Sequence, residues 1–317
     1  MVLVSEAPIV WKNLKGILCV YKPPGVKISF LRKTVITNLC NDLCELQCRP
    51  PGDHVFIEGD PLKALTVRKA LSFADHVLVV GPRYQPEDLR CGWAMHLGRD
   101  TSGVCVLGLN EGLRLARRLH LSRPTRAYHV KGLLGQATDT YFVDGQVVEK
   151  ATFHHVKKSV VDKILAAMQA AHQKQMFEQC GVDIQSQAAY DLAVQGPIRP
   201  GSGDLPVLYG IKCVHFSPPH FTLEIQCINE YEMYLKTLVH ELGLQLRSAA
   251  TCAAVQCIRY GHLTTQHALL RRHWRLQHVL ANLRQCAEAL GHGALARDSA
   301  ALVAGSGCRQ QATEAGG

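Results

Sequence analysis

The chain has 317 residues, 47% of them hydrophobic, and a net charge of +9, and it contains no apolar run long enough to cross a membrane. This composition predicts a soluble protein with a sizeable core rather than a membrane-spanning one. The basic charge favours an anionic partner, among which nucleic acid is the commonest. Glu6 closely follows the short apolar start of the chain, so no signal peptide is expected.

Strand and helix patterns interleave along the chain. The apolar residues 17–21 run into the turn KPPG at residues 22–25, which predicts a strand that ends in a tight turn. Residues 49–66 are expected to be irregular. Apolar and alternating runs predict further strands at residues 104–109, 126–134, 205–215 and 220–228. Apolar side chains at helical spacing predict helices at residues 111–121, 159–178 and 231–247.

These elements lack the regular strand–helix–strand repeat of a doubly wound parallel sheet. We therefore predict an α/β fold of the α+β type, with a mixed, largely antiparallel central sheet flanked by helices. Residues 14–290 are expected to form this domain, after an N-terminal extension of residues 1–13. Residues 291–317 are rich in Gly, Ala, Ser and Gln, which is typical of a disordered tail.

The 13 cysteines are an odd number scattered through the chain, which favours reduced thiols in an intracellular protein. Cys40, Cys44 and Cys48 would share one face if they lie on a helix, and three thiolates can hold zinc or an iron–sulfur cluster. The alternative is a helix face turned to the core, because a free cysteine behaves as a small buried hydrophobe. No Cys-x-x-Cys pair and no fourth ligand at a suitable spacing accompanies the triplet.

Five short motifs occur in a fixed order between residues 14 and 265. They are YKPPGV at 21–26, HLGRDTSGV at 96–104, the stretch from RAY at 126–128 to DG at 144–145, AYDLAVQG at 189–196 and YLKTLVHELG at 234–243. Together they resemble the motifs of TruB-type RNA pseudouridine synthases, and the animal mitochondrial branch is the most similar. The resemblance covers most of the chain.

The resemblance implies a reaction on RNA that needs no metal and no organic cofactor. The family flips a uridine out of an RNA stem-loop, detaches the uracil and rejoins it through carbon, and an aspartate handles the covalent or proton-transfer step. Tyr128 matches the tyrosine that stacks on the flipped base. Lys236 matches the arginine that pairs with the aspartate, and Leu238 would pack in the pocket.

The position of the catalytic aspartate holds Gly98. The aspartate of the family motif lies five residues before the glycine of the Ser-Gly pair, and counting back from Gly103 gives Gly98. Asp100 is off that register by two residues, and a turn-capping carboxylate is its simplest structural role. A lysine at position 236 also lacks the planar bidentate fork of arginine.

Three hypotheses follow from this departure. In the first, the protein is an RNA-binding member of the family that no longer catalyses, and aspartate at position 98 together with arginine at position 236 would restore part of the activity. In the second, Asp100 takes over and the protein is an active synthase. In the third, the protein binds a metal through Cys40, Cys44 and Cys48.

RNA binding is expected from basic residues beside the motifs, which could neutralise phosphates. The candidates are Lys22, Arg114, Arg117, Arg118, Arg126 and Lys131. The RNA could be a tRNA, an mRNA or an rRNA, and the protein could act within an RNA-processing assembly. The N-terminus lacks the pattern of a transit peptide, so a mitochondrial location is expected only from the resemblance, with the cytoplasm and the nucleus as alternatives.

Overall fold

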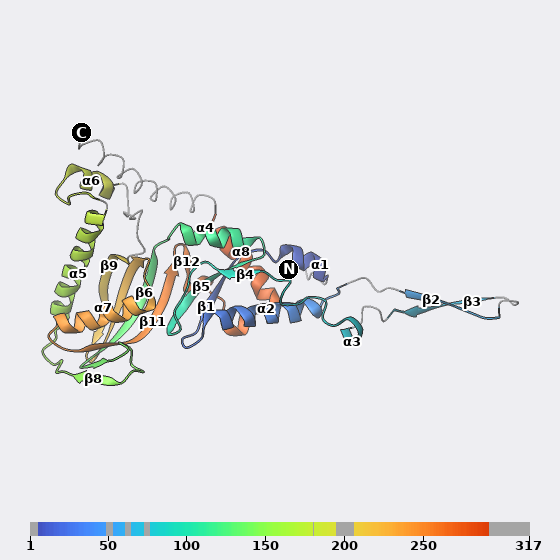
Figure 1. Cartoon of the computed structure of the whole chain (residues 1–317), viewed down its shortest axis with the longest axis horizontal. Coiled ribbons are helices and arrows are strands. Elements are labelled where there is room, and N and C mark those ends of the chain that lie inside the picture. Colours follow the sequence, from blue (N-terminus) through green and yellow to red (C-terminus); the bar gives the residue numbers. More distant parts are fainter. Residues whose placement is uncertain are drawn as a thin grey trace.

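The computed structural model describes residues 6–48, 53–60, 65–72, 77–179, 181–194 and 206–291, and a mixed sheet forms the centre of these parts (Figure 1). Its main strands are β1 (Gly16–Lys22), β5 (Thr101–Leu109), β6 (Arg126–Leu134), β9 (Val207–Ser217), β10 (His220–Ile228) and β11 (Ala250–Tyr260). They pair in the order β1-β5-β11-β6-β10-β9. The short strands β4 (Cys91–Trp93) and β12 (Leu263–Thr264) pair with β5 and β11. The strands predicted from the sequence at these places are confirmed.

The pairing of β5 with β11 is parallel, and the other described pairs of this sheet are antiparallel. All nine residues of β5 are buried, as its unbroken apolar run indicates. Gly103 lies where β5 meets β11, with a φ of +108°, and a Cβ there would lie 2.0 Å from the carbonyl oxygen of Cys257. Only glycine fits this position. The predicted mixed, largely antiparallel sheet is therefore confirmed.

Helices cover the sheet. The larger ones are α2 (Ile28–Cys44), α4 (Gly112–Leu121), α5 (Lys158–Gln179), α7 (Glu232–Gln245) and α8 (Leu276–Ala289). α7 packs against β11, α5 against β9, and α8 against β1. The helical periods predicted for residues 111–121, 159–178 and 231–247 are confirmed. In α7, Leu235, Leu238, Val239 and Leu242 are buried, because residues at this spacing share the face turned to the sheet.

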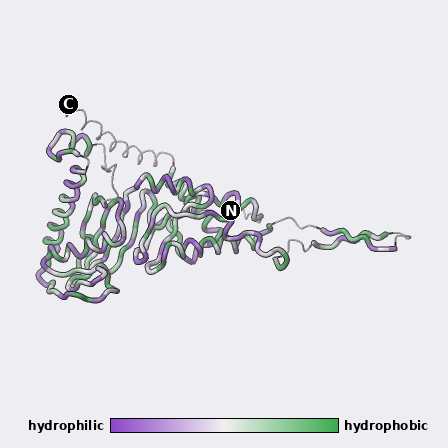
Figure 2. The backbone as a smooth tube through the Cα atoms, viewed as in Figure 1, coloured by the Kyte–Doolittle hydropathy of each residue, from purple (hydrophilic) through white to green (hydrophobic). Residues whose placement is uncertain are grey.

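The prediction that residues 49–66 are irregular is wrong in part. β2 (Asp53–Glu58) and β3 (Thr66–Leu71) pair as a separate antiparallel hairpin, drawn apart from the main sheet in Figure 1. Its apolar side chains Val55, Phe56, Ile57 and Val67 are exposed. Figure 2 colours hydrophobic stretches of this hairpin green along its backbone. A second small hairpin pairs β7 (Gln136–Thr138) with β8 (Val147–Lys150).

The remaining helices are short. They are α1 (Ala7–Asn13), α3 (Val77–Val80), α6 (Gln187–Val194), and the 3-10 turns η1 (Thr265–His267) and η2 (Arg271–His273). α1 covers part of the expected N-terminal extension, and its Ala7 and Val10 are buried in the main core. The tail expected at residues 291–317 lies outside the described residues, except for Gly291. None of the described helices combines the length and apolarity needed to span a membrane.

Candidate active site around Gly98 and Lys236

The turn that carries Gly98 precedes β5 and is fastened to the end of β1. The Lys22 Nζ donates hydrogen bonds to the carbonyl oxygens of Pro23 at 3.2 Å, Arg99 at 2.9 Å and Thr101 at 2.6 Å. The backbone N–H of Gly25 also donates to the Arg99 carbonyl oxygen, at 2.9 Å. The KPPG turn and the Gly98 turn, far apart in the sequence, thus form one unit.

Lys22 is fully buried in this structure, and its role in RNA binding stays a prediction. All three donors of an ammonium are used on backbone carbonyls, and none remains for a phosphate. Burial lowers the pKa of Lys22, and the negative charge of Glu232 opposes that shift. The role of Lys22 is to hold the backbone of the turn.

Lys236 faces the Gly98 turn from α7. Its Nζ lies 2.7 Å from Asp100 Oδ2 and 3.3 Å from Glu232 Oε1, and its side chain is 7% exposed. Burial lowers the pKa of Lys236, but the hydrogen bond to Asp100 and the charge of Glu232 outweigh burial, and the net shift is upward. Lys236 is therefore a charged ammonium between two carboxylates.

The motif that follows β6 places an aromatic ring next to this ammonium. Asp139 Oδ1 accepts hydrogen bonds from the backbone N–H groups of Thr140 and Gln146, which closes the turn between β7 and β8. The same turn presents Phe142, whose ring centroid lies 4.4 Å from the Lys236 Nζ. The TD…DG segment thus contributes a cation–π contact to the site.

Glu232 is the site residue that the motifs did not reveal. Its Oε2 accepts hydrogen bonds from the backbone N–H of Asp100 at 3.0 Å, and from the N–H and hydroxyl of Thr101 at 2.8 and 2.7 Å. It is the first residue of α7 and stands four residues before Lys236. An acidic and a basic residue four positions apart share one helix face. This spacing was the signal in the sequence that could have identified Glu232.

Gly98 lies directly against the side chain of Glu232. A Cβ built on Gly98 would lie 2.0 Å from Glu232 Oε2, 2.3 Å from its Cδ and 2.7 Å from its Cβ. The position expected to hold the catalytic carboxylate therefore has a carboxylate beside it, but one that is supplied by α7.

Tyr128 lies inside the protein. Its side chain is 2% exposed, and its hydroxyl donates to Glu230, which also pairs with Arg126 at 2.9 Å. Burial first, and then the charge of Glu230, raise the pKa of Tyr128 well above its usual value. Leu238 is also in the main core, at 1% exposed. Neither side chain offers its surface to a base in this structure, and their substrate roles stay predictions.

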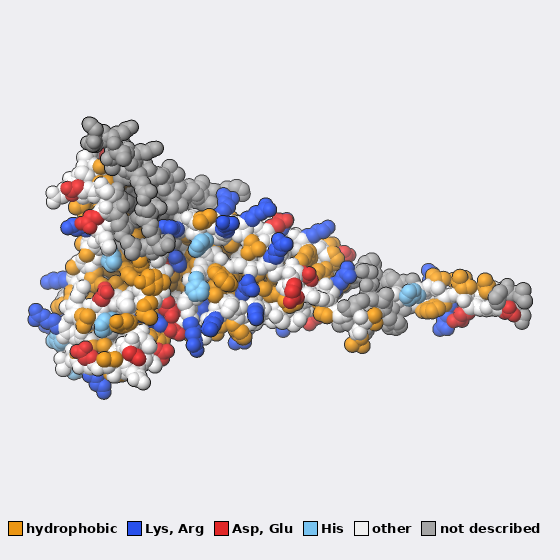
Figure 3. Space-filling view, in the orientation of Figure 1, with side chains coloured by type: hydrophobic (Ala, Val, Ile, Leu, Met, Phe, Trp, Pro, Cys, Tyr) orange, Lys and Arg blue, Asp and Glu red, His pale blue; other side chains and the backbone are white. Residues whose placement is uncertain are grey.

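The basic residues separate into two groups. Arg114, Arg117 and Arg118 are exposed on α4, over which Lys and Arg side chains gather in Figure 3, and Lys131 is exposed on β6. Arg126 has a side chain that is 15% exposed and is bound to Glu230. The guanidinium of Arg126 therefore faces a buried carboxylate, and its role in RNA binding stays a prediction.

The cysteine triplet does not form a ligand set. Cys40 and Cys44 lie on α2, but Cys48 lies beyond its end, and its Sγ contacts the carbonyl oxygens of Leu43 and Leu46. Burial raises the pKa of Cys40 to about 11, which disfavours the thiolate that a metal requires. Within the described residues, no three His, Cys, Asp or Glu side chains are grouped to hold a metal.

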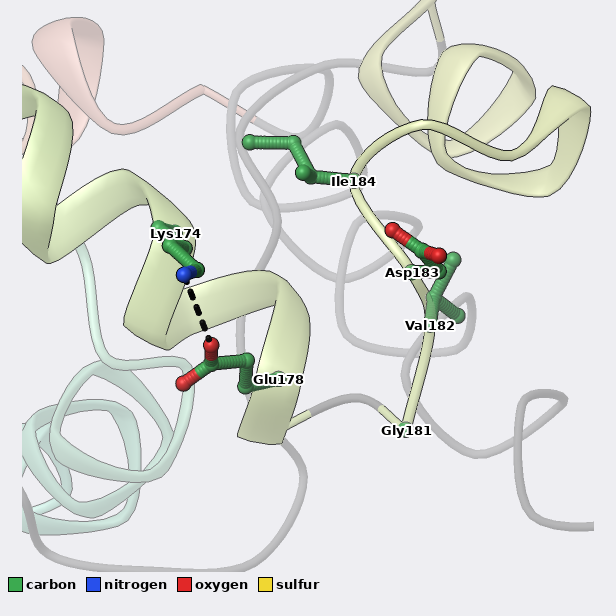
Figure 4. Close-up of a pocket in the computed structure, with 6 residues that line it drawn as sticks. All are labelled: Lys174, Glu178, Gly181, Val182, Asp183 and Ile184. Carbon is green, nitrogen blue, oxygen red and sulfur yellow. Dashed lines mark ion pairs between the residues drawn. The ribbon is translucent and has the colours of Figure 1, made fainter.

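A pocket at the end of α5 is separate from these groups. It is lined by Lys174, Glu178 and residues 181–184, and Lys174 pairs with Glu178 at 3.8 Å across exposed side chains (Figure 4). The pair is a surface i,i+4 contact. The lining residues include none of the motif residues around Gly98, so the pocket adds nothing to the candidate site.

Comparisons with known proteins place the chain in a family. A model described as TruB family pseudouridylate synthase (N terminal domain) matches residues 84–233. Pseudouridylate synthase TRUB2, mitochondrial, of Xenopus tropicalis is 42% identical over 287 residues, which is 88% of this chain and 88% of that protein. The Homo sapiens protein of that name is 40% identical over 279 residues, covering 86% and 84%.

A solved structure shows a more distant likeness. The crystal structure of the archaeal box H/ACA sRNP Nop10-Cbf5 complex contains a chain that is 14% identical. The match covers 92% of this chain and 60% of that one, with a TM-score of 0.42, and it is too remote to inform the site. The assignment rests on the long sequence matches at 40% identity and above, and this chain belongs to the TruB family of pseudouridylate synthases.

Proposed function

We propose that this protein binds structured RNA and acts in the modification of uridine to pseudouridine in RNA, while its own site lacks the aspartate of the reaction. The RNA would be a tRNA, or a mitochondrial mRNA or rRNA. The observation that carries the proposal is Gly98, which sits in an otherwise intact motif between Leu97 and the Ser-Gly pair that ends at Gly103. A mitochondrial location follows from the names of the TRUB2 relatives.

The chemistry explains why Gly98 matters. A glycine has no side chain that could attack carbon or carry a proton, and losing such a group usually reduces the rate by several orders of magnitude. What remains of the family machinery is the fold and an exposed basic face on α4. Exposed cations neutralise phosphates without any catalytic group, and this supports a binding role.

A second candidate function is an active synthase that uses Asp100. The observation that favours it is the 2.7 Å contact between Asp100 Oδ2 and the Lys236 Nζ, since the cation of this motif pairs with the aspartate in the family. The Asp100 side chain is also 24% exposed, which is enough to meet a ligand. Asp100 stands two residues beyond the family position, so the substrate uridine would have to bind in a different position.

An assay of turnover and binding on one RNA stem-loop tests both candidates. We expect the natural protein to bind the RNA in a filter assay and to release no tritium from [5-³H]uridine above background. Robust tritium release that is lost in Asp100→Asn would reject the first candidate in favour of the second. Absence of RNA binding would reject both, and fractionation of cells that make the full chain tests the location separately.

A further inference from the structure

Gly98 and Glu232 compete for one volume. The Cβ of any larger residue at position 98 would lie within 2.0 to 2.7 Å of three atoms of the Glu232 side chain. Nonbonded heavy atoms prefer separations of about 3.5–4.0 Å, so both side chains cannot be present in this arrangement. Gly98 does not lie in the left-handed region of φ, so its backbone does not require glycine. The neighbouring carboxylate is what requires it.

Moving the Glu232 side chain aside would break its hydrogen bonds and its ion pair. Its Oε2 holds three donors of Asp100 and Thr101, and its Oε1 lies 3.3 Å from the Lys236 Nζ. The side chain is 17% exposed. Displacing it would leave two backbone N–H groups and a hydroxyl without their acceptor, and unsatisfied donors with little access to water are costly.

We infer that Gly98 and Glu232 form an exclusive pair, in which the Glu232 carboxylate takes the space next to Lys236 that a side chain at position 98 would need. Glu232 is then a positioning residue, which orients residues 100–101 and Lys236 and touches no reacting atom. This inference rests on the proposed function, because it concerns the position at which the family carries its aspartate.

The pair changes what restores the family reaction. Aspartate at position 98 collides with Glu232, and arginine at position 236 does nothing to remove that collision. Alanine at position 232 is also insufficient, because the Glu232 Cβ itself lies 2.7 Å from the built Cβ. Glycine at position 232 removes all three contacts. We therefore expect Gly98→Asp to recover turnover only together with Glu232→Gly.

Thermal unfolding tests the shared volume without any activity. Gly98→Ala should lower the melting temperature of the natural chain by at least about 2 °C, because overpacking destabilises a protein of this size by that order. In the Glu232→Gly background the same alanine should change it much less. Met233→Gly is the matched control, since Met233 is exposed on the same helix turn, and there the full decrease should persist. Equal decreases in all three backgrounds would overturn the inference.

Tritium release from a uridine-labelled stem-loop tests the consequence for the reaction. Gly98→Asp with Glu232→Gly should exceed either single variant by at least about 10-fold, since a restored catalytic group contributes orders of magnitude. Gly98→Asp with Met233→Gly should stay at background. Gly98→Asp with Glu232→Gln should also stay at background, because glutamine keeps the volume and removes only the charge. Recovery with glutamine, or with Gly98→Asp alone, would overturn the inference.

The two measurements separate failure of the inference from failure of the proposed function. Coupled melting temperatures without tritium release in any variant would uphold the exclusive pair and count against a family-type uridine site. Independent melting temperatures would reject the pair, whatever the RNA assay shows.

Discussion

At the scale of single residues, two basic side chains make other contacts than those expected from the motifs. Lys22 was expected on the surface, but its ammonium is buried and binds three carbonyl oxygens. Arg126 was expected to meet phosphate, but it neutralises Glu230. The sequence could not distinguish a buried lysine or arginine from an exposed one, because the residue type is the same in both cases. Whether such a side chain is buried depends on the strands and turns that surround it in the fold.

Replacing Lys22 with methionine tests its structural role. Methionine keeps much of the length but leaves the carbonyl groups of Pro23, Arg99 and Thr101 without their donor. We expect the free energy of unfolding in urea to fall by about 2–3 kcal/mol, the usual cost of unsatisfied buried acceptors. Lys27→Met is the control, since Lys27 is exposed, and it should change stability little. Similar decreases in both variants would contradict the role.

At the scale of elements, α7 supplies both buried core residues and charged residues of the candidate site. Leu235, Leu238 and Val239 face β11, and Glu232 and Lys236 share the face that meets the Gly98 turn. The period of the helix was predicted from its leucines. The partner of its charged face was not, because the sequence gives no distance between residues 98–101 and residues 232–236. The relative position of the two segments depends on the pairing of β5 with β11.

The exposed face of α4 should govern the salt dependence of RNA binding. Replacing Arg114, Arg117 and Arg118 with glutamine removes three exposed cations from one helix. We expect the slope of log affinity against log salt concentration to flatten by roughly 0.7 for each phosphate that is no longer neutralised. The measurement is a filter-binding series on a stem-loop over a range of salt concentrations.

A control of equal charge comes from the other end of the sheet. Lys157, Lys158 and Lys163 are exposed at the start of α5, and their replacement by glutamine removes the same net charge. If the α5 variant flattens the slope as much as the α4 variant, binding reflects overall charge, and α4 is not the interface.

At the scale of the whole molecule, most of the fold could be predicted from the sequence. Buried strands such as residues 104–109 and amphipathic helices such as residues 231–247 are set by local apolar periods, which are visible in one sequence. The hairpin of β2 and β3 was missed, because its apolar residues are exposed and follow no core-facing alternation. The site was predicted only as positions in motifs. Its hydrogen bonds join residues up to 136 apart.

Binding of RNA should stabilise the whole molecule whether or not it reacts. A ligand that binds only the folded state raises its stability by RT ln(1 + [L]/Kd), or about 2.7 kcal/mol at 100 times Kd. We expect a structured stem-loop to raise the melting temperature of the natural chain and of Asp100→Asn alike. A polyanion of equal charge, such as heparin, is the comparison, and an equal shift with heparin would show that folded RNA is not specifically recognised.

The anchoring of the Gly98 turn by Lys22 has a consequence for how this site could diverge. The anchor binds main-chain carbonyl oxygens, which every amino acid possesses, so these three contacts do not depend on the identity of the turn's side chains. A change at position 98 is limited instead by Glu232, which lies on a different element of the fold. The return of a reactive group to this turn therefore depends on an earlier change at position 232, in a part of the chain more than a hundred residues away.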